Sequence, residues 1–267
     1  MIIVQIMGGL GNAMFRYALF CNLFGRHNDV YCETFYDYPT KYRGSAKIVD
    51  MFDVFNTALK PITDKSLLDR VTPFQENTWP AFNPEILKKE NVHLCGNWQN
   101  VGYFPDEGFL RNEFMFKREL DEKNENVLKD IQGSNSVSIH VRKTDYIEMP
   151  GYFFQADWMN YYGMAVNHVA RSVKERPLKF FVFSDDVEWC RKNLMIEATF
   201  VENNQKEGWK DMLLMSNCKH NVIANSSFSW WSAWLNKNPG KIVVTPKRWY
   251  LDGTDSGLIT LKEWIKI

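Results

Sequence analysis

The chain has 267 residues, of which 45% are hydrophobic and 24% charged, so it has the composition of a folded protein and room for one large or two modest domains. Its 32 basic and 32 acidic residues cancel, which excludes a generic nucleic-acid binder and a polybasic membrane protein. Any anion site must therefore be local and built from a few placed groups. Five cysteines without a CxxC pair or zinc-like spacing favour reduced thiols in a cytosolic protein.

The first predicted elements are a strand, a tight turn, a helix and a second strand. Residues 2–6 are apolar almost without alternation, which is typical of a strand covered on both faces in a parallel sheet. A turn at 8–12 follows, then an apolar helix over 13–24 with Asn12 as its N-cap, and a strand at 30–32. This order opens a doubly wound α/β domain.

The turn between the first strand and the first helix is rich in glycine. Gly8, Gly9 and Gly11 allow the backbone to approach a ligand and to expose N–H groups at a helix start. The turn is not the dinucleotide fingerprint, because Met14 stands where the third glycine belongs. A purely structural turn explains it equally well.

The middle of the chain is harder to interpret. Five prolines interrupt residues 36–90, so only short helices are predicted there. A strand ends at 93–96, and a helical pattern begins at 107 and continues to 130. After a polar break the pattern restarts, which predicts two domains, 1–132 and 133–267.

Strands and helices alternate through the second half, which predicts an α/β domain with a parallel sheet. The predicted strands are 137–141, 178–183, 198–201, 221–224 and 241–245. The predicted helices are 158–175, 187–194, 211–217 and 225–236.

The loop after the strand at 137–141 carries the strongest candidate for anion binding. His140 and Arg142 alternate, so both lie on one side of the extended chain, at the strand end that faces a ligand crevice. An arginine there can grip a diphosphate bidentately, Lys143 adds charge, and Asp145 can orient the arginine. An ordinary ion pair in a loop is the alternative.

Two aspartates follow the next strand. Asp185 and Asp186 can serve as a base, bind a metal, or accept hydrogen bonds from a ribose or a guanine. One of them can instead cap the helix that begins near Val187. No DxD motif of the metal-binding type occurs, so a metal is not required.

A third candidate segment begins at Asn225. Ser226 and Ser227 supply hydroxyl and N–H groups at a helix N-terminus, which is a ready anion site, and Phe228 follows them. The helix is apolar on nearly all sides, so its tryptophans are interpreted as core residues rather than as sugar platforms. These loops together outline one site for an anionic ligand.

Several motifs resemble those of a known family when they are read in order. The chain resembles the α-1,2-fucosyltransferases, an inverting GT-B glycosyltransferase family, over nearly its whole length. The similar segments are GGLGNAMFRY at 8–17, LCGNWQ at 94–99 with YF at 103–104, SIHVRKTDY at 138–146, FFVFSDDVEWC at 180–190 and NSSFSWWSAWL at 225–235.

The resemblance implies transfer of L-fucose from GDP-β-L-fucose to the 2-hydroxyl of a terminal galactose, with inversion and without a metal or other cofactor. It implies two Rossmann-like domains facing across a cleft, with the acceptor and the glycine turn on the N-terminal side. The partners would be the donor and a galactose-terminated oligosaccharide or lipid-linked glycan, with no nucleic acid.

The resemblance also implies roles for particular residues. The expected catalytic group is Arg142 at the β-phosphate, with His140 and Asp145. The expected donor contacts are Gly8, Gly9, Gly11, Asn12, Lys143, Asp185, Asp186, Asn225, Ser226, Ser227 and Phe228.

The sequence departs from the family pattern at a few positions. Lys143 and Thr144 replace an arginine and a glycine, and Ala13 and Arg16 replace two glutamines. Lysine keeps the charge without bidentate geometry, so Lys143 is expected to be secondary. No motif identifies the general base, and Asp37, Asp145 and a donor phosphate oxygen all remain candidates.

The cellular location is predicted from the start of the chain. The first six residues are too short for a signal peptide, and no apolar run approaches the roughly 18–20 residues of a membrane span. Animal members of the family carry a membrane anchor. A bacterial-type cytoplasmic enzyme, peripheral at the inner membrane and serving the synthesis of O-antigen or other surface polysaccharides, is therefore expected.

Two rival functions remain. A nicotinamide oxidoreductase is suggested by Gly9 and Gly11 with Glu33 about 20 residues further on, as a ribose-binding acid would be. A non-catalytic glycan-binding protein is suggested by the ten tryptophans. Binding of GDP but not NADH argues against the first rival, and slow hydrolysis of GDP-fucose argues against the second.

Overall fold

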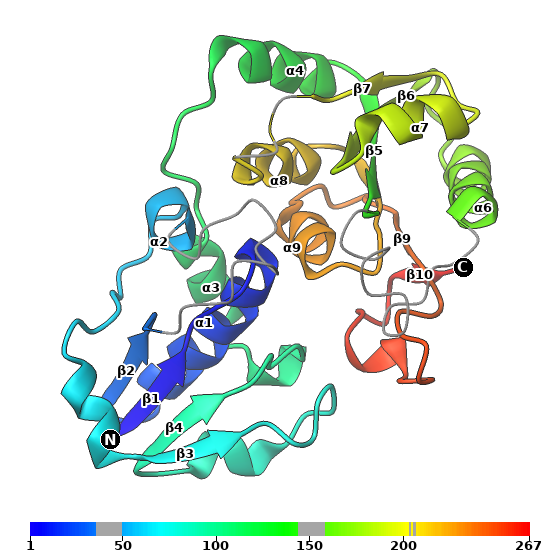
Figure 1. Ribbon diagram of the computed structural model, residues 1–267. Helices are drawn as coiled ribbons and strands as arrows, with labels where there is room; N and C mark the ends of the chain where they lie inside the picture. The colour runs from blue at the N-terminus through cyan, green and yellow to red at the C-terminus, as the bar shows by residue number, and fades with distance from the viewer. Residues whose placement is uncertain (36–49, 144–157, 203, 205–206) are drawn as a thin grey trace. The chain divides into compact units, whose positions relative to one another are not determined.

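The structure is a computed structural model, and it describes residues 1–35, 50–143, 158–202, 204 and 207–267. The chain forms two compact units (Figure 1). Unit 1 comprises Met1–Arg118, and unit 2 comprises Glu119–Ile267.

Unit 1 is built on a parallel sheet with the strand order β2-β1-β4-β3. Its strands are β1 (Ile2–Gln5), β2 (Val30–Glu33), β3 (Thr72–Gln75) and β4 (Val92–Cys95). Its helices are α1 (Leu10–Phe24), α2 (Asp50–Val54) and α3 (Glu107–Glu113), with 3-10 turns η2 (Lys65–Arg70), η3 (Pro84–Lys88) and η4 (Val101–Tyr103). Figure 1 shows α1, in blue, lying along this sheet.

Strand β3 corrects the prediction that residues 36–90 contain only short helices. It pairs with β4 alone and forms the edge of the sheet. An edge strand tolerates a proline such as Pro73, because the missing N–H need not face a neighbouring strand.

The glycine turn differs from the prediction in one detail. Helix α1 begins at Leu10 with Gly9 as its N-cap, so Asn12 lies inside the first turn and is not the cap. Gly8 adopts a φ of 86°, in the left-handed region that favours glycine. The turn therefore needs glycine at position 8 for the backbone to enter the helix.

The long helix predicted from residue 107 to 130 is two helices, α3 and α4 (Glu122–Gln132). Asp121 caps α4 by accepting a hydrogen bond from the Asn124 backbone N–H at 3.0 Å, which fixes its start. Although the sequence placed this helix in the first domain, α4 packs with unit 2. Its fully buried Ile131 contacts that core, and Asp121 pairs with Lys210 at 2.7 Å.

Unit 2 has a parallel sheet with the strand order β10-β9-β8-β5-β6-β7. Counted from β5 as the first strand, this is the 3-2-1-4-5-6 order of a doubly wound domain. The strands are β5 (Asn135–Val141), β6 (Leu178–Ser184), β7 (Ala198–Phe200), β8 (His220–Val222), β9 (Val243–Thr245) and β10 (Ile265–Lys266). The sequence did not predict β10.

The helices of unit 2 are α6 (Trp158–Ser172), α7 (Val187–Asn193), α8 (Trp209–Ser216) and α9 (Ser227–Leu235), with a 3-10 turn η5 (Ser256–Leu258). Trp230 and Trp231 on α9 are fully buried and Trp234 nearly so, which confirms their interpretation as core residues. Across the described parts of the chain, none of the helices combines the length and the apolar character needed to span a bilayer.

Candidate functional site

In unit 2 the strand order reverses between β5 and β8. Ligands of doubly wound domains bind outside the carboxyl ends of the strands at such a switch point. Arg142 and Lys143 follow β5, and the segment 225–228 follows β8. Topology thus brings two of the three predicted anion-binding segments to this switch point, while Asp185 and Asp186 follow the adjacent β6.

The two cations after β5 each have an acidic partner after β6. Arg142 Nη1 lies 3.5 Å from Asp185 Oδ2, and its side chain is 29% exposed. Asp185 Oδ1 also accepts a hydrogen bond from the Lys143 backbone N–H at 3.0 Å. Asp185 therefore contacts the arginine and holds the loop that carries it, which is the role predicted for Asp145. Asp145 lies outside the described residues.

Lys143 lies closer to its carboxylate partner than Arg142 does to Asp185. Its Nζ donates to Asp186 Oδ2 at 2.6 Å and lies 5.3 Å from the centre of the Trp189 ring. Asp186 Oδ1 accepts from the Trp189 backbone N–H at 3.0 Å and so caps α7, as the structural alternative predicted. The hydrogen bond from Lys143 lowers the pKa of Asp186.

His140 is buried beneath this loop. Its residue is 4% exposed, its ring centroid is 5.5 Å from that of Phe228, and its carbonyl accepts a hydrogen bond from Tyr162 Oη at 2.8 Å. Burial, with a smaller contribution from Arg142, holds the pKa of His140 well below its usual range. Its Nδ1 has no hydrogen-bond partner among the described residues. A neutral, buried imidazole therefore lies near the carboxyl end of β5.

The start of α9 follows β8, the other strand of the switch point. Ser226 is the N-cap, and its hydroxyl accepts from the Phe228 backbone N–H at 3.3 Å. Asn225 Nδ2 donates to the Trp249 carbonyl at 2.8 Å, so this side chain anchors the loop. Ser227 is half-buried as the first helical residue. The positive end of the helix dipole thus lies at the same strand edge as Arg142.

The predicted glycine-turn residues belong to unit 1. Asn12 Oδ1 accepts a hydrogen bond from Gln99 Nε2 at 2.8 Å, and a side-chain atom added at Gly8 would come within 3.7 Å of Arg16 Nη1. Gly9 precedes α1, and Gly11 is buried within it. The turn therefore contacts the segment after β4, at the switch point of unit 1 between β1 and β4.

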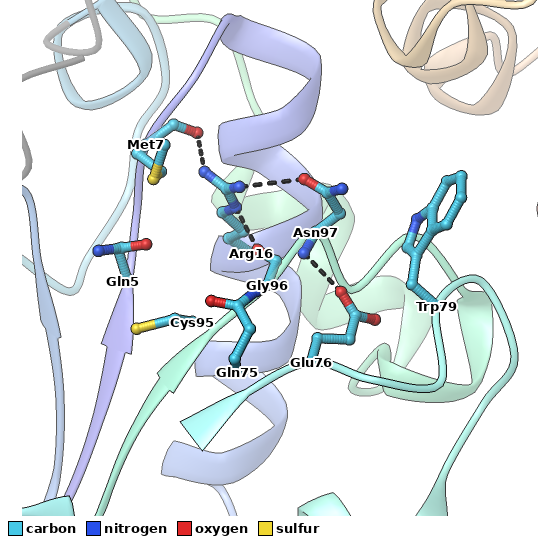
Figure 2. A pocket seen from close by; sticks show the side chains of 9 residues that line it. All are labelled: Gln5, Met7, Arg16, Gln75, Glu76, Trp79, Cys95, Gly96 and Asn97. Atoms are coloured by element: carbon cyan, nitrogen blue, oxygen red, sulfur yellow. Dashed lines mark hydrogen bonds between the residues drawn. The ribbon is translucent and has the colours of Figure 1, made fainter. Parts of the chain in front are cut away.

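A pocket of about 460 Å³ lies at this switch point of unit 1, and sequence reasoning missed it. The last residues of three adjacent strands, Gln5, Cys95 and Gln75, form one side. Figure 2 shows all of the lining side chains, which are Gln5, Met7, Arg16, Gln75, Glu76, Trp79, Cys95, Gly96 and Asn97.

Two charged side chains hold the loop that follows β4. Arg16 donates to the Gly96 carbonyl at 2.5 Å, to Asn97 Oδ1 at 3.1 Å and to the Met7 carbonyl. Glu76 Oε2 accepts from the backbone N–H groups of Asn97 at 2.6 Å and Trp98 at 3.1 Å. A side chain at Gly96 would collide with Glu76, so the close approach requires glycine there.

Trp98 within this loop has a φ of 53°, which is unusual for a bulky residue, and it is fully buried. Its ring meets Tyr103 edge to face, with the centroids 5.6 Å apart. The next residue, Gln99, links Trp79 to Asn12, because its Oε1 accepts from Trp79 Nε1 at 3.3 Å. The segment at 94–99 that carried the family resemblance is thus the end of β4 and a loop that Glu76 and Gln99 hold by hydrogen bonds.

No group of three or more histidine, cysteine, aspartate or glutamate side chains is placed to hold a metal ion within the described ranges. The prediction that no metal or other cofactor takes part therefore stays a prediction.

The sequence model of glycosyl transferase family 11 matches residues 1–267. An alpha-1,2-colitosyltransferase of Escherichia coli is 29% identical over 93% of this chain and 92% of its own length. The O-antigen biosynthesis glycosyltransferase WbnK of Escherichia coli is 38% identical over 51% and 46% of the two lengths. Galactoside alpha-(1,2)-fucosyltransferase 1 of Ateles belzebuth is 26% identical over 67% and 55%.

Solved structures share the fold at low identity. The NodZ alpha-1,6-fucosyltransferase co-crystallized with GDP superposes with a TM-score of 0.55 at 13% identity, over 88% of this chain and 91% of that one. The fucosyltransferase NodZ from Bradyrhizobium gives 0.54 at 12% identity, over 88% and 92%. This likeness and the two parallel sheets confirm the predicted α/β fold of the GT-B type. The cleft expected between the units stays a prediction.

Proposed function

The chain belongs to glycosyl transferase family 11, and from this premise we propose that it transfers L-fucose from GDP-β-L-fucose to the 2-hydroxyl of a terminal galactose in a glycan. The product would be an α-1,2 linkage formed with inversion and without a metal. The names of its relatives, which include α-1,2 transferases and an O-antigen glycosyltransferase, support this choice of linkage and acceptor class.

The observation that carries the proposal is the cationic pair at the switch point of unit 2. Arg142 is partly exposed after β5 and oriented by Asp185, and it shares the strand edge with the start of α9. A guanidinium and a helix N-terminus are the groups that bind a diphosphate most readily. Lys143 adds a second positive charge, while its tight contact with Asp186 makes it the secondary group.

The chemistry asks for charge stabilisation at this place. The acceptor oxygen attacks the anomeric carbon on the face opposite the diphosphate, and the bond from that carbon to the β-phosphate oxygen breaks. The bonding electrons pass to the diphosphate, while the hydroxyl proton leaves to a base. Placed donors that meet the developing negative charge lower the barrier, and Arg142 is the residue proposed for this catalytic role.

The neighbouring residues fit supporting roles in donor binding. The buried His140 ring, neutral at pH 7, offers a hydrogen-bonding nitrogen without adding charge, and Phe228 packs beside it. Asp185 and Asp186 hold the cations, and their remaining lone pairs suit a nucleoside. Ser226 and Ser227 would line the phosphates, with Asn225 holding their loop.

The remaining assignments rest on the family alone. Gly8, Gly9, Gly11 and Asn12 would approach the donor from unit 1, which would also carry the acceptor. Asp145 and Asp37, two candidates for the general base, lie outside the described residues. A phosphate oxygen of the donor is the third candidate.

A second donor is favoured by one specific observation. The relative that matches the chain over 92% of its own length is named as an alpha-1,2-colitosyltransferase. Colitose is the 3-deoxy analogue of L-fucose, so the two donors differ at one hydroxyl. GDP-fucose remains the proposed donor, and GDP-colitose is the alternative donor for the same site.

The direct test is a transfer assay. Purified protein is incubated with either donor and a panel of galactose-terminated oligosaccharides, with and without EDTA, and the linkage is assigned by NMR. An α-1,2-linked product from GDP-fucose, formed equally with EDTA, supports the proposal. A different linkage, or a requirement for a metal, contradicts the corresponding part of it.

The two rival functions have separate readouts. Thermal stabilisation by NADH but not by GDP would favour an oxidoreductase. Saccharide binding with neither transfer nor slow hydrolysis of GDP-fucose would favour a non-catalytic glycan-binding protein.

A further inference from the structure

We propose that the pocket of unit 1 binds a neutral saccharide, the terminal sugar of the acceptor, with Glu76 accepting a hydrogen bond from one of its hydroxyls. This inference rests on the proposed function for the identity of the sugar. The pocket itself is argued from its position, its charge and its unsatisfied polar group.

Its position is the one at which parallel sheets bind ligands. The pocket lies where the order β2-β1-β4-β3 reverses, outside the carboxyl ends of β1 and β4. Three consecutive strands end on it at Gln5, Cys95 and Gln75, so its walls are fixed by the sheet rather than by loops alone. A rigid floor of this kind is a feature of a preformed ligand site.

Its charge excludes a phosphate as the natural occupant. Arg16 and Glu76 are the only charged residues in the described lining, and their charges cancel. Arg16 is 6% exposed, and its guanidinium is already engaged by two backbone carbonyls and Asn97. What remains toward the pocket is amide, thiol, indole and carboxylate chemistry, which suits a neutral ligand with many hydroxyl groups.

Glu76 supplies the unsatisfied group. Its Oε2 accepts two backbone N–H groups of the loop, while its Oε1 is buried and has no hydrogen-bond partner among the described residues. Burial raises the pKa of Glu76 above its usual value. A buried acceptor without a donor is costly, so a ligand hydroxyl that donates to Oε1 would be favourable.

Trp79 provides the apolar contact that sugar sites use. It borders the pocket, is half-buried, and is held by the hydrogen bond from its Nε1 to Gln99. Figure 2 shows its ring standing at one end of the lining residues, beyond Glu76 and Asn97. An indole face can pack against the C–H groups of a sugar ring while the amides and Glu76 meet its hydroxyls.

Cys95 allows the pocket to be probed without relying on activity. Cys21, Cys32, Cys190 and Cys218 are buried, whereas Cys95 is partly exposed and lines the pocket. A thiol reagent such as iodoacetamide should therefore alkylate Cys95 first in the folded protein, and mass spectrometry can follow its rate. An occupant of the pocket slows this rate in proportion to its occupancy.

The experiment has four arms: buffer, GDP, a galactose-terminated oligosaccharide, and both together. At ten times its dissociation constant the saccharide should slow Cys95 alkylation about tenfold, whereas GDP alone should not. Cys190 serves as the internal control for unfolding. If no saccharide of the panel protects Cys95, with or without GDP, the inference is overturned.

The outcomes separate this inference from the proposed function. Protection of Cys95 by a saccharide without any transfer of fucose would leave the pocket assignment standing and overturn the proposed activity. Transfer of fucose without protection of Cys95, at saccharide concentrations that saturate turnover, would support the proposed activity and overturn the pocket assignment.

A substitution tests the role of Glu76. Glu76→Gln keeps an acceptor oxygen for the loop and removes the charge, so KM for the saccharide should rise about tenfold while KM for the donor is unchanged. Gln75→Ala removes an exposed lining amide, which cannot unfold the core, and should raise the same KM less. The matched control Glu85→Gln, an exposed carboxylate paired with Lys88, should change neither. An unchanged saccharide KM in both pocket variants contradicts the inference.

Discussion

The two units carry the same kind of sheet, with different chemistry at the point where the strand order reverses. In unit 2 the loops after β5 and β8 present two paired cations and a helix N-terminus. In unit 1 the ends of β1, β4 and β3 present amides, a thiol and one carboxylate, and Arg16 of α1 is bound to the loop after β4. The comparison teaches that topology selects where a ligand binds, and that the residues just past the strand ends select its charge.

The histidines of the two sheets show the same contrast. His140 on β5 is buried beside Arg142 and is held neutral. His93 on β4 lies 3.7 Å from Cys95 Sγ and 3.0 Å from Glu33 Oε1, and these contacts raise its pKa to about 9. The two rings therefore carry different charges at neutral pH, because burial and then Arg142 disfavour the charged form of His140, whereas hydrogen bonds with Cys95 and Glu33 favour the charged form of His93.

The largest expected effect comes from removing the guanidinium of unit 2. Arg142→Ala should lower kcat by about 10²–10³-fold, because a placed donor to the developing charge is lost, while the fold is kept. Circular dichroism checks the fold, and release of GDP measures turnover. Arg191→Ala is the matched control, because Arg191 pairs with Glu202 on the surface of the same unit. Near-normal turnover in Arg142→Ala would remove this residue from the mechanism.

The next largest effect is on the free energy of unfolding, whose dependence on pH has opposite signs for His93 of unit 1 and His140 of unit 2. The pKa of His93 is raised from an ordinary 6.5 to about 9 in the folded state. Its contribution is therefore complete below about pH 6.5 and is lost as the pH rises through 9, with an upper limit of about 3.5 kcal/mol at about 1.4 kcal/mol per pKa unit. His140 instead costs stability as the pH falls below its ordinary pKa, since only the unfolded chain takes up the proton.

Histidine-ring NMR and urea unfolding at several pH values measure these contributions. The ring of His140 should stay neutral down to pH 5, whereas that of His93 should lose its proton near pH 9. The substitution His93→Gln should remove the loss of stability toward pH 9, whereas His168→Gln on α6 should not. Parallel titration of both rings near pH 6.5 would break the comparison.

The smallest effect is expected at Lys143. Its Nζ is already bound to Asp186 and it contacts Trp189, so Lys143→Gln should raise the donor KM about threefold and change kcat little. Lys174→Gln, an exposed residue of the same unit, is the control. A loss of kcat as large as that of Arg142→Ala would show that the two cations act as one unit.

The sequence predicts the fold class well because apolar strands and glycine or polar breaks are local signals. The strands at 137–141 and 178–183 are found within a few residues of their bounds. Strand β3 escapes prediction because Pro73 is a breaker signal, and only the pairing with β4 shows that the strand lies at an edge. The two-residue β10 is too short to have a pattern.

The residues of the two candidate sites also differ in whether a local sequence pattern predicts them. His140, Arg142 and Lys143 lie within four positions of one another at a strand end, so their spacing alone predicts a site. No local pattern predicts that Asp185 is the partner of Arg142, because the parallel register of β5 and β6 brings the two residues together. Glu76 reaches the loop at 96–98 only through the pairing of Gln75 with Cys95, and no local pattern reports that pairing.

The left-handed backbone of Trp98 has a consequence for how unit 1 responds to an occupant. A bulky residue in that region stores about 1–3 kcal/mol, and the Glu76 carboxylate that grips its N–H helps to offset this cost. The same carboxylate has its second oxygen buried at the pocket. The backbone strain at Trp98 and the occupancy of the pocket are therefore thermodynamically linked through the Glu76 side chain. A substitution at Trp98, which does not line the pocket, would change the affinity of the pocket for its ligand.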